Sequence, residues 1–345
     1  MYKFFVVFMI LMMTITYLSC SQQDKYFSKI NDAIEHYRNG NYQKAGEAFD
    51  EAFKIGDPNK GDFYNAACSW ALAGNKEKAL DYVDKAIESG WLQIDWLKKD
   101  PDLESLHGDP RWEAALEKLE YKLTNIEKSF PEEHAIIKTI DLEEPRYESD
   151  HSVEEALKNR RSVRSYKNEP VTLKELSQIL WAAYGITKEI PGGPDFLRGG
   201  MRTAPSAGAL YPLEIYVVAG DVKGLEDGIY WYDSEDHKLH QLQIGDKRAE
   251  LASAGLDQLM LERAPLSLVY SAIFERTTKK YGERGRERYV MMDLGHSAEN
   301  VYLQAGAMGL GTCAVGAFSD LQVKMLINMT KEEEPLYLMP IGKLR

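Results

Sequence analysis

The chain has 345 residues and a formal net charge of −12, from 42 Lys and Arg residues against 54 Asp and Glu residues. This length exceeds the roughly 100–200 residues of one domain, so two domains are expected, and a hydrophobic content of 44% suffices for ordinary cores. The acidic balance disfavours nonspecific binding to nucleic acid or to an anionic membrane surface. Three cysteines are too few for a disulfide framework.

The amino terminus has the pattern of an export signal. Residues 4–18 are almost wholly apolar and follow Lys3, but this run is shorter than the roughly 20 residues needed to span a bilayer. The polar residues after Ser19-Cys20 predict a bacterial lipoprotein signal over residues 1–20. Cys20 would then be lipidated and anchor the chain to a membrane of the cell envelope, outside the cytoplasm. A plain cleaved signal and a short uncleaved anchor are the alternatives.

A repeat of 34 residues follows the signal. The same offset relates Gly40-Asn41 to Gly74-Asn75, Ala45 to Ala79 and Ala52 to Ala86. Small residues at fixed positions let paired helices approach closely, and the period resembles that of tetratricopeptide repeats. We therefore predict an all-α tetratricopeptide-like array over residues 21–125. Residues 126–150, with two prolines and an acidic run, are predicted to be a linker.

Two roles are open for the helical array. Such arrays often bind an extended peptide, and Trp91, Trp96 and Trp112 are candidates for an aromatic binding stripe. Aromatic residues at helical spacing also form cores, in which case the array only packs against a neighbouring domain. A peptide or protein partner on the array is therefore one of two expectations.

Residues 151–345 have clusters of cations at both ends. These are Arg160, Arg161 and Arg164, which flank Ser162, and Lys343 with Arg345 at the carboxyl end. Guanidinium groups pair bidentately with phosphate or carboxylate, and residues two apart in a strand point to the same face. In an acidic chain, five cations at the two ends of one domain predict that a phosphate is neutralised there.

Two segments of small residues lie between these ends. In the first, Pro205 and Pro212 bracket Ser206, Ala207 and Gly208 just before an apolar strand. Small side chains there allow the backbone to lie against a large planar ligand and to donate N–H groups to it. The second segment, residues 309–318, lacks the glycine spacing of the dinucleotide fingerprint, and the chain has no GxxxxGK[ST] phosphate loop. Rossmann-type binding and nucleotide hydrolysis are therefore disfavoured.

Residues 153–345 resemble the nitroreductase superfamily, and within it the SagB-type branch of azoline dehydrogenases. The resemblance rests on residues 160–164, 180–186 and 205–212, on Lys280-Tyr281-Gly282 with Arg284, on Gly295-His296 with Asn300, and on Gly309-Leu310-Gly311. It implies an α+β fold in which helices flank a central, mainly antiparallel sheet. It also implies that FMN is bound at a homodimer interface.

The resemblance implies a role for each matching position. Arg160, Arg161, Ser162 and Arg164 would contact the FMN phosphate and ribityl chain, with Lys343 and Arg345 closing on the phosphate. Pro205, Ser206, Ala207 and Gly208 would face the ring from the other subunit. The Gly316 N–H, next to Ala317, would reach flavin N5, where a donated hydrogen bond favours the reduced flavin. Ala209 and Tyr184 depart from residues common in the superfamily and in this branch, and Tyr184 leaves the substrate preference open.

Lys280 and Tyr281 occupy the position of a catalytic Lys-Tyr pair in azoline dehydrogenases. Oxidation of an azoline removes a proton next to a carbonyl and a hydride, and a Lys or Tyr with a lowered pKa can accept the proton. The alternative is that Lys280, Lys279 and the arginines that follow form a solvated basic loop.

These observations predict an exported FMN-dependent oxidoreductase. Two alternatives remain: a nitro- or quinone reductase of broad specificity, and a partner-binding repeat protein with a catalytically silent flavin domain. No metal site is predicted, because His237 and His240 would face opposite sides of a strand. His296 and Cys313 are expected to be packing residues.

Overall fold

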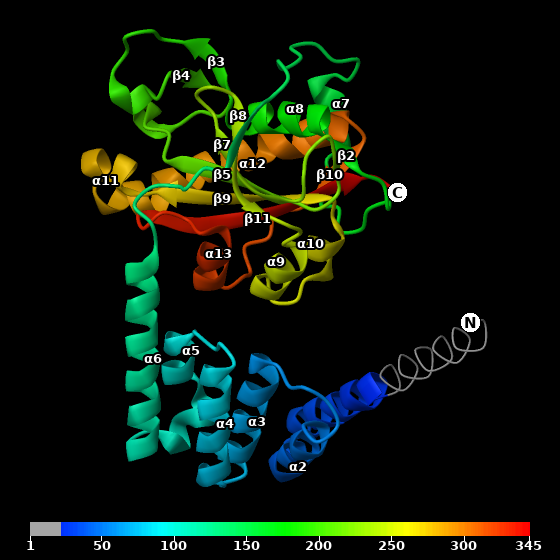
Figure 1. Cartoon of the computed structure of the whole chain (residues 1–345), viewed down its shortest axis with the longest axis vertical. Coiled ribbons are helices and arrows are strands. Elements are labelled where there is room, and N and C mark those ends of the chain that lie inside the picture. The colour runs from blue at the N-terminus through cyan, green and yellow to red at the C-terminus, as the bar shows by residue number, and fades with distance from the viewer. Residues whose placement is uncertain (1–21) are drawn as a thin grey trace, which may run out of the picture. The chain divides into compact units, whose positions relative to one another are not determined.

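The computed structural model describes residues 22–345, which form two compact units that divide between Lys128 and Ser129 (Figure 1). The predicted signal over residues 1–20 and the lipidation candidate Cys20 lie outside the described residues. Within residues 22–345, no helix combines the length and the apolar character needed to cross a membrane.

The first unit is built from helices over its described residues. They are a helix over residues 22–38, α2 (Tyr42–Ala52), α3 (Lys60–Leu72), α4 (Lys76–Glu88), α5 (Ile94–Lys99), the 3-10 helix η1 (Pro101–Leu106) and α6 (Pro110–Ser129). Gly40, Gly74 and Gly108 have φ of 74°, 80° and 78°, in the left-handed region that favours glycine. Each of them precedes a helix, and the 34-residue period therefore corresponds to a recurring turn before α2, α4 and α6. The tetratricopeptide assignment stays a prediction.

Close packing and one carboxylate join the helices of this unit. A Cβ on Gly46 would lie 2.5 Å from Cε2 of Trp70, so only glycine fits there without a shift of the indole. Asp50 accepts hydrogen bonds from Trp70 Nε1 at 3.2 Å, Lys78 Nζ at 2.6 Å and Tyr82 Oη at 2.6 Å. Asp50 thereby connects α2 to both α3 and α4.

The second unit is built around a seven-stranded sheet in which all the neighbouring strands pair antiparallel. In sheet order the strands are β1 (Lys138–Asp141), β8 (Lys238–Ile244), β7 (Gly228–Asp233), β5 (Leu213–Ala219), β9 (Leu266–Ile273), β11 (Glu333–Lys343) and β10 (Leu310–Thr312). Two small sheets pair β2 (Val171–Thr172) with β6 (Val222–Lys223), and β3 (Ile186–Glu189) with β4 (Gly200–Arg202). The predicted α+β fold with a mainly antiparallel sheet is confirmed.

Helices cover both faces of this sheet (Figure 1). Strand β5 is buried along its whole length, and its side chains alternate between two cores, with Ile215 and Val217 in one and Tyr216 and Val218 in the other. The first core includes α8 (Leu173–Tyr184) and α12 (Val290–Ala307); the second includes α9 (Arg248–Ala254), α10 (Leu259–Arg263) and α13 (Asp320–Ile327). Further helical elements are α7 (Val153–Asn159), η2 (Asp195–Leu197), η3 (Ala207–Ala209), α11 (Glu275–Tyr281) and the π-helical η4 (Gly285–Tyr289).

The segment predicted to be a linker, residues 126–150, belongs largely to the second unit. Its strand β1 pairs with β8, where Lys138 opposes Gln241 and Asp141 opposes Lys238. The linker prediction is therefore wrong over residues 138–141, and the boundary lies at Ser129. Three of the four β1 residues are exposed. The composition therefore indicates a polar stretch, whereas backbone pairing with β8 decides its structure.

Candidate active site

The arginine-rich segment after α7 lies along β10 and the end of β11. Val163 N donates a hydrogen bond to Thr312 O at 2.8 Å, and Lys167 N donates to Lys343 O at 3.0 Å. The buried Tyr166 hydroxyl donates to Val163 O at 2.8 Å. These bonds bring the cation-rich segments from the two ends of residues 151–345 to one edge of the sheet.

Four guanidinium groups at this edge have no carboxylate partner among residues 22–345. They belong to Arg160, Arg161, Arg164 and Arg345. The Arg160 guanidinium lies 5.4 Å from the ring centroid of Tyr302, and Arg161 donates to the carbonyl oxygens of Lys158 and Arg160. In a chain of net charge −12, such a cluster of unpaired guanidinium groups suits an anionic ligand.

Lys343 differs from these arginines. Its ammonium forms an ion pair with Glu175, a residue of the first turn of α8. Glu175 also accepts a hydrogen bond from Thr172 N at 2.9 Å. Burial opposes the ionisation of Glu175, but the bonds from Lys343 and Thr172 outweigh it and lower the pKa of the carboxyl. The ammonium predicted to close on a phosphate is thus already neutralised by a carboxylate.

The turn predicted to face a planar ring is fixed by Asp293 of α12. Ser206 Oγ donates to Asp293 Oδ2 at 2.6 Å, and Ala207 N donates to Asp293 Oδ1 at 3.3 Å. Ser206 Oγ also accepts a hydrogen bond from Tyr211 N at 3.0 Å. Asp293 is only 2% exposed, and burial raises the pKa of its carboxyl. Ala209 and Tyr211 have φ of 55° and 44°, so these side-chain bonds hold the backbone in a strained conformation at two non-glycine residues.

Arg202 holds the same turn from inside the core. Its guanidinium lies 5.0 Å from the ring centroids of both Tyr184 and Tyr211, and it donates to Ser234 Oγ at 2.8 Å. A charged group that is 6% exposed needs such partners to offset its lost hydration. The sequence alone does not indicate this role for Arg202.

The buried carboxylate of Glu214 on β5 also stabilises the turn that ends at Tyr211. Glu214 pairs with Arg198 at 3.0 Å and with Arg276 at 2.6 Å, and both guanidinium groups also donate to Tyr211 O. Trp231 Nε1 donates to the other Glu214 oxygen at 2.9 Å. Sequence reasoning missed these residues. The sequence does contain one indication of them, because Glu214 is the single acidic residue of the otherwise apolar strand Leu213–Ala219. A charge buried in such a strand requires a cationic partner.

The end of α11 brings the predicted catalytic pair to this turn. A Cβ on Gly208 would lie 2.8 Å from Tyr281 Oη and 3.1 Å from Lys280 Nζ. Lys280 is exposed, and its ammonium lies 5.3 Å from the ring centroid of Tyr281. The pair and the predicted ring-facing turn are therefore adjacent in one chain, and a side chain larger than glycine at position 208 would separate them.

The second glycine-rich segment ends in an open turn. Gly316 and Ala317 are exposed, and Ala314 N, just before them, donates to Tyr302 Oη at 2.7 Å. Tyr302 Oη also lies 3.2 Å from Ser162 Oγ. The segment predicted to contact flavin N5 and the arginine-rich segment are therefore joined through one hydroxyl of α12.

The histidines noted in the sequence have separate surroundings. Burial lowers the pKa of His237. His240 stacks on the Trp231 ring, with centroids 5.3 Å apart. His296 is exposed on α12, and its Nδ1 lies 3.3 Å from the carbonyl oxygen of Pro205.

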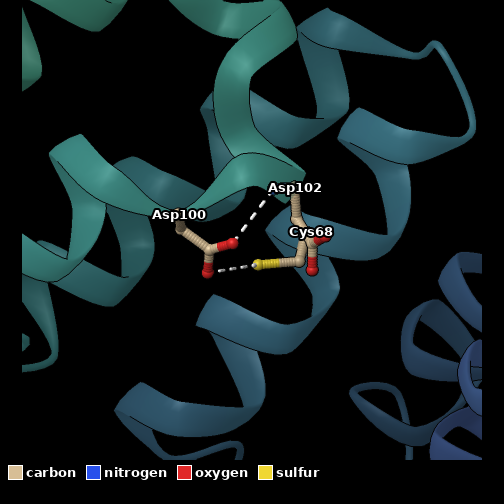
Figure 2. A group of neighbouring side chains, drawn as sticks. All are labelled: Cys68, Asp100 and Asp102. Carbon is tan, nitrogen blue, oxygen red and sulfur yellow. Dashed lines mark hydrogen bonds between the residues drawn. The ribbon is translucent and has the colours of Figure 1, made fainter.

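A further polar cluster lies in the first unit. Cys68, Asp100 and Asp102 place their ligand-type atoms within 4.8 Å of one another (Figure 2). Tyr64 and Tyr37 donate hydrogen bonds to Asp100 and Asp102, respectively, and Asp102 N donates to Asp100 Oδ1 at 3.0 Å. These bonds use both oxygens of Asp100 and one of Asp102, and they connect α3 to η1.

Comparison with known proteins gives the class of the second unit. The chain matches the model of the Nitroreductase family over residues 157–343, which is more than half of its length. The chain therefore belongs to the nitroreductase family, whose catalytic members are oxidoreductases that generally use FMN.

The curated relatives include a nitroreductase-family protein and two processing proteins. The chain is 46% identical over 205 residues to the nitroreductase-family protein MJ1384 of Methanocaldococcus jannaschii, a match of 59% of this chain and 97% of that protein. It is 34% identical over 113 residues to the trifolitoxin-processing protein TfxB of Rhizobium leguminosarum, and 29% identical over 133 residues to the microcin B17-processing protein McbC of Escherichia coli. These matches cover 32% and 37% of this chain, and 30% and 48% of those proteins.

The fold agrees with solved nitroreductase structures. A crystal structure from Ralstonia eutropha JMP134 superposes with a TM-score of 0.52 at 30% identity, over 63% of this chain and 94% of that one. A crystal structure from Anabaena variabilis gives a TM-score of 0.51 at 26% identity, over 60% of this chain and 42% of that one.

Proposed function

We propose that the chain is an FMN-dependent oxidoreductase whose cofactor phosphate is bound by the arginines at the β10 edge. The observation that supports this proposal is the set of four guanidinium groups without carboxylate partners among the described residues: Arg160, Arg161, Arg164 and Arg345. Planar guanidinium groups suit phosphate oxygens. FMN, when bound, supplies a ring that accepts or donates a hydride at N5.

Each of the other segments has a defined task in this proposal. The Asp293-bound turn, Pro205 to Gly208, presents small side chains and backbone amides to the ring. The open turn at Gly316 offers a backbone N–H as a hydrogen-bond donor. Lys280 and Tyr281 stand beside Gly208 as proton acceptors for a substrate carbon acid.

We propose azolines within peptides as the substrate class. The similarity to TfxB and McbC, proteins that process trifolitoxin and microcin B17, supports a peptide substrate. The position of Lys280 beside the turn supports proton removal from such a ring. A nitro- or quinone reductase of broad specificity is the second candidate, favoured by the match to MJ1384 over 97% of that protein.

The proposed enzyme is a homodimer. Helix α7 buries none of its residues, and its Val153 and Leu157 side chains are 66% and 55% exposed. At the start of α12, Met291 and Met292 are 42% and 52% exposed. Apolar surface of this kind on elements next to a site marks an interaction surface, and a second copy is the occupant that the proposal assigns to it.

The proposed location is the bacterial cell envelope, with a lipid anchor on Cys20 and the helical unit available for a peptide or protein partner. The location and the lipid anchor rest on the sequence pattern of residues 1–23. Cys20→Ser should move the protein from the membrane fraction to the soluble or unprocessed pool in a native bacterial host. Membrane retention of Cys20→Ser would reject the lipid anchor.

The central test is to purify the full chain in detergent and record its visible absorbance. The proposal expects bound, releasable FMN, and Arg160→Ala should lose it during purification because this variant binds FMN more weakly. The matched control is Arg263→Ala, which removes an exposed arginine of α10. A colourless protein that takes up no added FMN would overturn the proposal.

The role of Lys280 needs its own pair of variants. Lys280→Ala should keep the flavin and lose turnover of a thiazoline- or oxazoline-containing peptide. Lys279→Ala, which changes an exposed neighbour paired with Glu275, should keep both. Unchanged turnover in Lys280→Ala would remove Lys280 from the mechanism and favour the reductase.

A further inference from the structure

Tyr302 of α12 connects two segments of the proposed FMN site. Its hydroxyl oxygen accepts a hydrogen bond from Ala314 N at 2.7 Å and lies 3.2 Å from Ser162 Oγ. Its ring lies beside the Arg160 guanidinium, at 5.4 Å. One side chain thus contacts the arginine-rich segment and the segment that leads to Gly316.

The donor fixes the direction of the first of these hydrogen bonds, whereas two arrangements are open for the second. The Ala314 N–H can only donate, so the Tyr302 oxygen is its acceptor. A tyrosine hydroxyl carries a single proton, and among the described residues its other hydrogen-bond partner is Ser162 Oγ. Either oxygen can be the donor in this pair, and the arrangement in which Tyr302 donates uses its proton within the chain and leaves the proton of Ser162 for a group outside it.

We propose that Tyr302 is a positioning residue that makes Ser162 a hydrogen-bond donor toward the phosphate of FMN. This inference rests on the proposed function. An ionised phosphate oxygen accepts hydrogen bonds, whereas a ribityl hydroxyl can donate or accept and does not need a donor of fixed direction. Ser162 is exposed, and it lies between arginines that have no carboxylate partner, so charge and hydrogen-bond direction both select an anion there.

The test compares FMN with riboflavin, which has the same ring and ribityl chain but no phosphate. Both are titrated into flavin-stripped full chain in detergent, followed by flavin fluorescence. Tyr302→Phe should weaken FMN binding about tenfold, about 1.4 kcal/mol, and leave riboflavin binding unchanged. Because Tyr302 acts through Ser162, adding Tyr302→Phe to Ser162→Ala should cost much less than tenfold.

The matched control is Tyr230→Phe. It also removes a tyrosine hydroxyl with two hydrogen bonds, to Glu226 O at 2.7 Å and from Gln241 Nε2 at 3.2 Å, but on β7. Both flavins should bind this variant as they bind the unmodified chain.

Three results would overturn the inference while leaving the proposed function in place: unchanged FMN affinity in Tyr302→Phe, an equal loss for FMN and riboflavin, or fully additive effects of the two substitutions. If Tyr302→Phe does not fold, Ser162→Ala provides the same comparison of the two flavins at an exposed position, and an equal loss there also overturns it. Failure of the unmodified chain to bind FMN would reject the proposed function, and this inference with it.

Discussion

Asp293 and Tyr302 lie nine residues apart on α12, so they face opposite sides of this helix and are separated by roughly 13 Å along its axis. Asp293 binds the turn that contains Ser206, and Tyr302 binds the segment that contains Ser162. The turn with Ser206 and the segment with Ser162 are the two halves of the proposed site. One chain therefore presents them on opposite sides of α12. This geometry supports a site in which each half meets the other half of a second copy.

Mixed dimers test this arrangement. Arg160→Ala damages one half and Lys280→Ala damages the other, so each variant alone should lack turnover. After subunit exchange at equal amounts, half of the dimers are mixed and each mixed dimer has one intact site. We expect recovery of about a quarter of the unmodified activity, because a twofold-symmetric dimer of the proposed kind has two equivalent sites. The measurement is turnover before and after exchange.

The control for this experiment uses two variants of the same half. Mixing Lys280→Ala with Tyr281→Phe should restore no activity beyond that of the separate variants, because no site in such a mixture is intact. Equal recovery in both mixtures, or none in either, would contradict a site shared between copies.

Lys343 should contribute less to FMN affinity than the arginines do. Its ammonium is paired with Glu175, whereas Arg160 has no carboxylate partner among the described residues. We expect Arg160→Ala to weaken FMN binding by roughly 10–100-fold, the effect of losing a charge-assisted hydrogen bond. Lys343→Ala should weaken it by less than roughly threefold and should lower thermal stability, because Glu175 loses its cation. Equal losses of FMN affinity would show that Lys343 exchanges Glu175 for the phosphate.

Glu333 of β11 should make the stability of the second unit depend on acid pH. Its side chain is 1% exposed. Burial raises the pKa of this carboxyl, but hydrogen bonds from four neighbours outweigh it and lower the pKa to about 2. The neighbours are His134, Ser271, Tyr216 and Thr330. Because the folded pKa lies below the ordinary value of 4.5, the carboxylate stabilises the fold above about pH 4.5, and this contribution is lost as the pH falls toward 2.

The measurement is the free energy of denaturant unfolding at several pH values. The shift corresponds to about 3 kcal/mol at neutral pH, so Glu333→Gln should unfold more easily at pH 7 and show a flatter dependence between pH 5 and pH 2.5. The control Glu334→Gln changes an exposed carboxylate paired with Arg286 and should alter the free energy by less than about 1 kcal/mol. An equally steep pH dependence in Glu333→Gln would contradict this assignment.

Gly46 of α2 should tolerate no side chain. A Cβ there would lie 2.5 Å from the Trp70 ring, which is itself held by a hydrogen bond to Asp50. We expect Gly46→Ala to destabilise the first unit by about 1–3 kcal/mol, the usual cost of overpacking, as measured by circular dichroism during thermal unfolding. At Gly306 of α12 an added Cβ would have no neighbouring atom of the described residues within 4 Å outside its own helix turn, so Gly306→Ala should be neutral or stabilising. Equal effects of the two substitutions would contradict the packing argument.

Local patterns in the sequence indicated part of the candidate site. Residues 160–164 and the pair Lys343 and Arg345 are recognisable as cation clusters, and the structure places both segments at the β10 edge. The turn at residues 205–208 is recognisable by its prolines and small residues. The 34-residue period marks the turns at Gly40 and Gly74, because a left-handed backbone favours glycine wherever it occurs.

Other residues of the site could not be predicted, because their partners are distant in the sequence. Asp293 meets Ser206 across 87 residues, and Tyr302 meets Ser162 across 140. The pairing of Lys343 with Glu175, which are 168 residues apart, could not be predicted either. It changes the expected role of Lys343 because its charge is already neutralised. Strand β1 was missed for the same reason, since its pairing with β8 depends on backbone hydrogen bonds rather than on its exposed side chains.

The sequence by itself determined the charge, the small-residue turns, the repeat period and the family resemblance, because each is a property of neighbouring or regularly spaced residues. Only the tertiary structure decided which of the clustered cations are already neutralised and which polar groups support the turns. It also decided that Asp293 and Tyr302, which hold the two halves of the proposed site, lie on opposite sides of α12. These properties depend on contacts between residues far apart in the chain. Such contacts form only when the sheet and its helices pack together, and the exclusion of water there makes them strong.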